Sequence, residues 1–155
     1  MTDDPIFTSS VHYKDPKRAL AWLADAFGFE ITMAIDGPPE APEQCHYEMS
    51  HAGRGRIMVG AEWADFVRSP ASIGRVNTQT VHVQMPSGLD EHCEHARSCG
   101  AVIAMEPADQ FYGDRTYRVA DPEGHVWVFS MHVRDVTRAD AEAAIGLPIV
   151  AQNWA

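Results

Sequence analysis

The sequence predicts an α+β fold made of two copies of one βαβββ unit. A first observation is the segment GFEITM at residues 28–33, which recurs as GAVIAM at residues 100–105 with Gly, Ile and Met in the same places. A second is the dipeptide Val-His, which precedes a predicted helix at residues 11–12 and again at residues 81–82. A unit of this length exceeds the usual solenoid repeat. We therefore expect the two units, residues 6–62 and 79–132, to form a curved mixed sheet, a cup, with the helices outside.

The first unit shows its elements through local signals. Imperfect alternation over residues 6–13 predicts a strand. Asp15 as N-cap and Pro16 in the first turn predict the start of a helix, and Gly28 its end. Three prolines within residues 36–42 mark a loop, because proline gives a sheet no hydrogen-bond donor. The other strands are predicted at residues 30–34, 44–50 and 56–62, and a linker at residues 63–79.

The second unit repeats this order and ends in a hairpin whose turn fixes its register. The turn Asp121-Pro122-Glu123-Gly124 predicts a three-residue loop with a bulge, which sets Asp121 opposite His125 and Arg118 opposite Val128. In this register the aromatic side chains share a buried face and Arg118 lies on the other, concave face. The predicted elements are a strand at 80–85, a helix at 89–99, a strand at 102–105 and the hairpin at 116–132.

The chain length of 155 residues suits one domain, which we place at residues 1–135. Residues 136–155 are predicted to form a C-terminal helix and tail, with Thr137 as the helix N-cap and Gly146 as its end. The tail is apolar enough to pack against another surface. A second subunit would provide one.

The charge distribution restricts the partners. A formal charge of −10 disfavours nucleic acids and anionic membranes, whose binding depends on Lys and Arg. Four arginines gather within residues 54–75, and we interpret them as a solvated hairpin tip and linker rather than an anion site. The three cysteines have no CxxC spacing, which suits a reducing compartment. Together with the lack of a long apolar segment, this predicts a cytoplasmic protein.

The segment YGDRTYRVADPEGHVW at residues 112–127, at the end of a duplicated βαβββ unit, resembles the vicinal oxygen chelate superfamily. This superfamily contains glyoxalase I, the bleomycin- and fosfomycin-resistance proteins and the extradiol dioxygenases. The chain looks closest to its metal-free, antibiotic-binding branch, related to bleomycin-resistance proteins. The resemblance implies a small-molecule site in the cup and a homodimer, in which the two units of a cup come from one chain or from two.

The resemblance also implies where a metal would bind in the catalytic members of the superfamily. Those ligand positions fall at Thr8, near Met58, at Thr78 or Thr80, and at Val128. Divalent metals prefer imidazole and carboxylate ligands, which these residues lack. The sequence therefore predicts no metal cofactor and favours metal-independent binding of a small aromatic or amphiphilic molecule, such as an antibiotic that is sequestered.

The residues that would face such a ligand follow from strand alternation. His12, His82 and Arg118 project to the concave side, and Arg118 can bind a carboxylate or phenolate with its planar guanidinium. Flat rings at loop edges would stack on the ligand. The candidate ligand-binding residues are Thr8, His12, Glu62, Trp63, Thr80, His82, Phe111, Tyr112, Arg118 and Val128.

Other functions fit part of the pattern. Arg118 could form a structural salt bridge with Glu62 or Glu48, and the two histidines could serve only as hydrogen-bonded sheet residues. A divalent-metal lyase or dioxygenase would use His12, His82 and Glu62 as displaced ligands. A protein without any ligand is a third alternative. The sequence leaves open whether a reaction is catalysed and which compound is bound.

Overall fold

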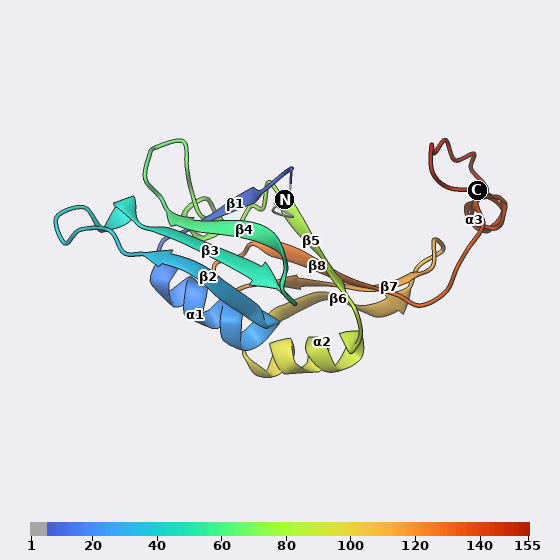
Figure 1. The fold of residues 1–155 in the computed structure, drawn as a ribbon, viewed down its shortest axis with the longest axis horizontal. Helices are drawn as coiled ribbons and strands as arrows, with labels where there is room; N and C mark the ends of the chain where they lie inside the picture. Colours follow the sequence, from blue (N-terminus) through green and yellow to red (C-terminus); the bar gives the residue numbers. More distant parts are fainter. Residues whose placement is uncertain (1–5) are drawn as a thin grey trace.

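Two four-stranded sheets lie side by side in the structure, a computed structural model that describes residues 6–155 (Figure 1). The first sheet has the order β1-β4-β3-β2 and the second β5-β8-β7-β6, with a parallel first pair in each. This equal order confirms the predicted pair of βαβββ units. The strands are β1 (Ser9–Tyr13), β2 (Phe29–Ile35), β3 (His46–His51), β4 (Arg54–Ala61), β5 (Thr80–Met85), β6 (Val102–Asp109), β7 (Asp114–Ala120) and β8 (Val126–His132).

The first two helices lie on one side of the two sheets in Figure 1. Helix α1 (Pro16–Phe27) begins as predicted, because the Asp15 carboxylate accepts a hydrogen bond from the backbone N–H of Arg18. Gly28 ends it in the left-handed conformation, with φ of +75°. Helix α2 (Leu89–Ser98) covers the second sheet and buries Leu89 and Cys93. None of the helices in the described part of the chain is long and apolar enough to cross a lipid bilayer.

Two strand predictions need correction. Strand β1 begins at Ser9 rather than at residue 6, and the Phe7 side chain is 90% exposed. Strand β6 continues to Asp109, beyond the predicted residue 105, although it contains Pro107. Proline is tolerated there because β6 is an edge strand, so the missing donor would have faced solvent.

The two sheets meet through side chains. Within residues 6–155, no strand of one sheet pairs with a strand of the other, so the single curved sheet that we expected is open at this point. The Phe27 ring packs instead on rings of the second unit, with centroid distances of 5.7 Å to Trp127 and 4.9 Å to Phe129. Both units therefore share one apolar core.

Two histidines add hydrogen bonds to the contact between the two units, at the C-terminal end of α1. The Nε2–H groups of His51 and His92 both donate to the Phe27 carbonyl, at 2.9 and 2.8 Å. His92 also accepts a hydrogen bond at Nδ1 from the Tyr117 hydroxyl, 2.6 Å away, so a neutral imidazole satisfies both partners. Burial lowers the pKa of His92 and favours that neutral form.

The turn of the last hairpin forms a second link between the units. The predicted register is confirmed, with Arg118 opposite Val128 and the Asp121 N–H bonded to the His125 carbonyl. The Asp121 carboxylate is buried and accepts hydrogen bonds from the Tyr13 hydroxyl at 2.6 Å and the Trp127 indole at 3.1 Å. Its other oxygen accepts from the backbone N–H groups of Glu123 and His125. One carboxylate thus joins β1, β8 and the turn.

The C-terminal segment lies apart from the sheets (Figure 1). Helix α3 (Arg138–Ile145) has Thr137 as its N-cap and Gly146 at its end, as predicted. The tail folds back on this helix, because the Trp154 indole donates to the Val136 carbonyl at 2.8 Å. Tail side chains such as Val150 remain exposed.

Candidate functional site

The helix-free face of the second sheet carries a row of side chains from all four strands. Register places His82 beside Val128, Val128 beside Arg118, and Arg118 beside Met105. Neighbouring residues across a sheet point to the same side, so these side chains form one surface. We call this surface the platform. It consists of Thr80, His82, Gln84, Val102, Met105, Thr116, Arg118, Ala120, Val126, Val128 and Ser130.

The platform combines exposed apolar side chains with the guanidinium of Arg118. Val102 and Met105 on β6 are 60% and 51% exposed, and Arg118 is exposed on the neighbouring strand β7. His82 is exposed on β5, at the opposite edge of the sheet. Val128 is buried in the centre of the row. Exposed apolar side chains that adjoin fixed polar groups are typical of binding surfaces.

Arg118 has no hydrogen bond or ion pair with any residue in the described range 6–155. The salt bridge to Glu62 or Glu48 that the sequence allowed is therefore wrong. Glu48 binds His46 Nε2 at 3.0 Å, and Glu62 accepts the Ser69 N–H at 2.8 Å. Both carboxylates are engaged in the first unit and the linker, which leaves the guanidinium of Arg118 directed to solvent.

The structure brings together only part of the predicted site. Thr80, His82, Arg118 and Val128 share the platform, and Phe111 and Tyr112 lie in the β6–β7 turn, in edge-to-face contact with centroids 5.1 Å apart. Burial raises the pKa of the Tyr112 hydroxyl. The remaining candidates, Thr8, His12, Glu62 and Trp63, lie in the first unit and the linker.

Three of these four residues, His12, Glu62 and Trp63, have local partners. His12 Nδ1 lies 3.1 Å from the Ala61 carbonyl, and Trp63 packs on Phe66 with ring centroids 5.3 Å apart. The Glu62 pKa is lowered by hydrogen bonds from Ser72 and Ser69 and by the charge of Arg68, which outweigh the opposite effect of burial. The hydrogen bond from the Ser69 N–H to Glu62 holds the linker to the end of β4.

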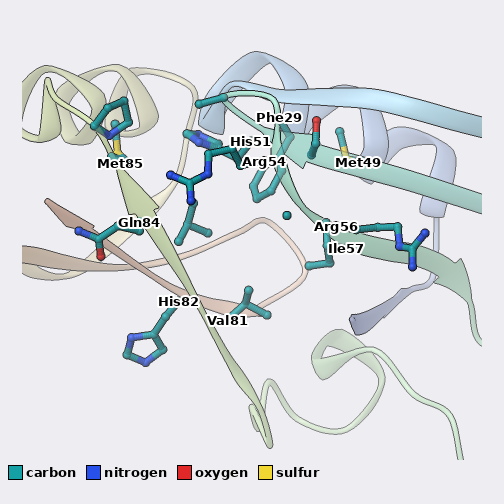
Figure 2. Close-up of a pocket in the computed structure, with 15 residues that line it drawn as sticks. Phe29, Met49, His51, Arg54, Arg56, Ile57, Val81, His82, Gln84 and Met85 are labelled. Atoms are coloured by element: carbon teal, nitrogen blue, oxygen red, sulfur yellow. The ribbon is translucent and has the colours of Figure 1, made fainter. Parts of the chain in front are cut away.

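A groove of about 550 Å³ separates the β3–β4 hairpin from β5 (Figure 2). Its polar lining includes His51, Arg54 and Gln84. Sequence reasoning missed His51 and placed Arg54 in a solvated hairpin tip. The cluster of arginines was the only sign of this groove in the sequence. The groove could not be predicted from it, because β5, which forms the opposite wall, lies about thirty residues further along the chain. The apolar lining is formed by Phe29, Met49, Ile57, Val81, Val83 and Met85.

The sequence profile of the Glyoxalase/Bleomycin resistance protein/Dioxygenase superfamily matches residues 9–129, which include the first sheet and all but the end of β8 in the second. The chain belongs to this superfamily. Among solved structures, TioX from Micromonospora sp. ML1 is 30% identical, covers 82% of this chain and 98% of its own, and superposes with a TM-score of 0.63. TnmS3, described as an antibiotic binding protein from Streptomyces sp. CB03234, shares the fold at 16% identity, with a TM-score of 0.63 and coverage of 85% and 98%.

Curated relatives from mycobacteria match a shorter stretch of this chain. Uncharacterized proteins of Mycobacterium bovis and Mycobacterium tuberculosis are each 34% identical over 77 residues, or 50% of this chain. The chain spans 49% and 44% of their lengths, which is about half of the curated relatives it matches.

The metal-ligand positions of the superfamily carry unsuitable side chains here. In the first sheet His12 lies beside Gly60, and in the second sheet His82 lies beside Val128. When the two units are aligned on their Val-His dipeptides, Gly60 is therefore the counterpart of Val128. From the sequence alone, we expected this ligand position of the first unit near Met58. Neither a glycine nor a valine side chain donates to a metal.

The displaced ligand set is not assembled either. Among the described residues, only Cys93, Glu94 and Glu106 bring three ligand atoms within 4.8 Å of one another, so His12, His82 and Glu62 do not. Arg97 binds both carboxylates of the assembled group, at 3.2 Å from Glu94 and 2.7 Å from Glu106. Burial raises the pKa of the Cys93 thiol, which opposes the thiolate that a metal needs. These donor sets do not fit a divalent metal.

Proposed function

We propose that this protein binds a small aromatic or amphiphilic anion on the platform without a metal ion, and that sequestration of such a compound is its role. The observation that carries the proposal is Arg118, an exposed cation without a protein partner in the described chain, set among exposed apolar side chains. A protein with a net charge of −10 would repel anions from most of its surface. The description of TnmS3 as an antibiotic binding protein supports an antibiotic as the ligand.

The chemistry of the platform defines the ligand. The guanidinium of Arg118 can hold a carboxylate or phenolate through two parallel N–H donors. Met105 and Val102 provide apolar contact beside the guanidinium. Phe111 and Tyr112 would stack on an aromatic ligand that extends toward the β6–β7 turn.

Replacing Arg118 with methionine should weaken binding of 2-naphthoate by about 1.5 to 3 kcal/mol, the range for a hydrogen bond to a charged group. The melting temperature should change little, because the side chain has no structural partner. Isothermal titration calorimetry and thermal denaturation would measure the two effects. Arg138→Met on α3 is the matched control, and the methyl ester of 2-naphthoate should bind wild type and Arg118→Met equally. A lower melting temperature with unchanged affinity would contradict the proposal.

Purified protein should contain less than about one tenth of an equivalent of transition metal, because Thr8, Gly60 and Val128 cannot replace imidazole and carboxylate ligands. Elemental analysis after dialysis measures this directly. Stoichiometric iron, nickel, zinc or manganese that disappears in a His12→Ala, His82→Ala double variant would favour the metal-dependent lyase or dioxygenase instead.

We also propose that the protein is a homodimer in the cytoplasm. Edge strand β2 exposes Met33 and Ile35, at 43% and 52%, and an uncovered apolar edge favours association with a second chain. Light scattering should give twice the chain mass at micromolar concentration, and the mass of a single chain would contradict the dimer.

A further inference from the structure

We propose that the groove between the β3–β4 hairpin and β5 is a second ligand site, which takes an aliphatic carboxylate bearing a hydroxyl group. The groove has an apolar floor and a cationic rim, and its volume of about 550 Å³ lies within the range of small-molecule sites. Nothing in the proposed role of the platform requires it. Three features of the lining define the ligand.

The first feature is an acceptor without a donor. His51 Nδ1 is buried and has no hydrogen-bond partner among the described residues. Because Nε2 donates to the Phe27 carbonyl at 2.9 Å, the neutral imidazole carries a lone pair, not a proton, at Nδ1. A buried acceptor without a partner costs free energy that a ligand O–H group would recover. This atom therefore selects a hydroxyl group.

The second feature is the Arg54 guanidinium. Arg54 is exposed at the hairpin turn and has no hydrogen bond or ion pair within residues 6–155. Figure 2 shows its side chain beside His51. Since a long exposed side chain moves easily, the Arg54 guanidinium can pair with a carboxylate that enters the groove beside His51.

The third feature is the floor. Met49, Ile57 and Met85 are buried at its base. Methionine and branched aliphatic side chains accommodate an alkyl chain, because thioethers fill irregular apolar spaces. The apolar part of the ligand is therefore aliphatic, in contrast to the flat ring expected on the platform.

The groove and the platform use different cations. The two sites adjoin along β5, because His82 and Gln84 belong to the platform and also line the groove. Figure 2 shows the His82 ring pointing away from Arg54 and His51. Arg118 does not line the groove. Variants of Arg54 and Arg118 can thus test the two sites separately.

The test measures binding of 3-hydroxydecanoate, decanoate and 3-methoxydecanoate by calorimetry. Wild type should bind the hydroxy acid about three- to tenfold more tightly than the other two acids, the range for one neutral hydrogen bond. Arg54→Met should weaken all three acids by about tenfold to a hundredfold, because it removes a charged partner of the carboxylate. In the Arg118→Met background, which removes the carboxylate partner on the platform, the preference for the hydroxy acid and the effect of Arg54→Met should both persist. Arg54→Met should leave 2-naphthoate binding unchanged.

His51 is tested by two variants. His51→Phe should abolish the preference for the hydroxy acid, whereas His51→Gln, which offers a carbonyl acceptor, should restore part of it. Should His51→Phe fail to fold, the comparison of hydroxy and methoxy acids on wild type decides the point. The proposal is overturned if none of the acids binds at millimolar concentration, if Arg54→Met binds them as wild type does, or if the methoxy acid binds as tightly as the hydroxy acid.

Discussion

Replacing Asp121 with alanine should lower the free energy of unfolding by about 3 to 5 kcal/mol, because two buried donors each lose their partner at a cost of roughly 1–3 kcal/mol. These donors are the Tyr13 hydroxyl and the Trp127 indole. The variant also frees two backbone N–H groups in the hairpin turn. Urea denaturation, followed by circular dichroism, measures the change.

Two controls separate the buried carboxylate from a general effect of removing an acidic residue. Asp65→Ala removes a fully exposed carboxylate that pairs with Arg68, and should change stability by less than about 0.5 kcal/mol. Tyr13→Phe removes one hydrogen bond and should cost about 1 kcal/mol. If Asp121→Ala were no more destabilising than Tyr13→Phe, the carboxylate would not be the link that the structure indicates.

Replacing Phe27 with alanine should cost about 3 to 5 kcal/mol, as is usual for removal of a buried aromatic ring. The ring lies between α1 and the aromatic face of the second sheet, so its loss affects both units together. Tryptophan fluorescence and circular dichroism should still give coincident unfolding curves, because the two units share one core.

The matched control is Phe7→Ala, which removes an exposed ring and should change the free energy of unfolding by less than about 0.5 kcal/mol. Separate transitions in the two probes would contradict the shared core. They would show that each unit unfolds independently of the other.

Local chemistry made the elements of this fold predictable. The Asp15 cap, the left-handed Gly28 and the turn at Asp121 each act within a few residues, and all three appear as predicted. The hairpin register followed from the turn alone. The relative position of the two sheets did not, because it depends on how Phe27 packs against rings about a hundred residues away.

The site was predictable to the same extent. Strand alternation placed Arg118, Val128 and His82 on one face, and register confirms it. Alternation could not show that Glu62 would bind the backbone of Ser69. The groove was missed for a similar reason, since Arg54 and β5 become neighbours only when the two units pack together.

The shared Phe27 carbonyl has a consequence for the origin of the chain. One of its two donors, His51, belongs to the first unit and the other, His92, to the second. An ancestral unit standing alone would have exposed the equivalent aromatic face and left that helix end without its second donor. Such a unit needed another copy to fold against. In this chain a linker joins the two halves, so their encounter is no longer bimolecular and their effective concentration is about millimolar.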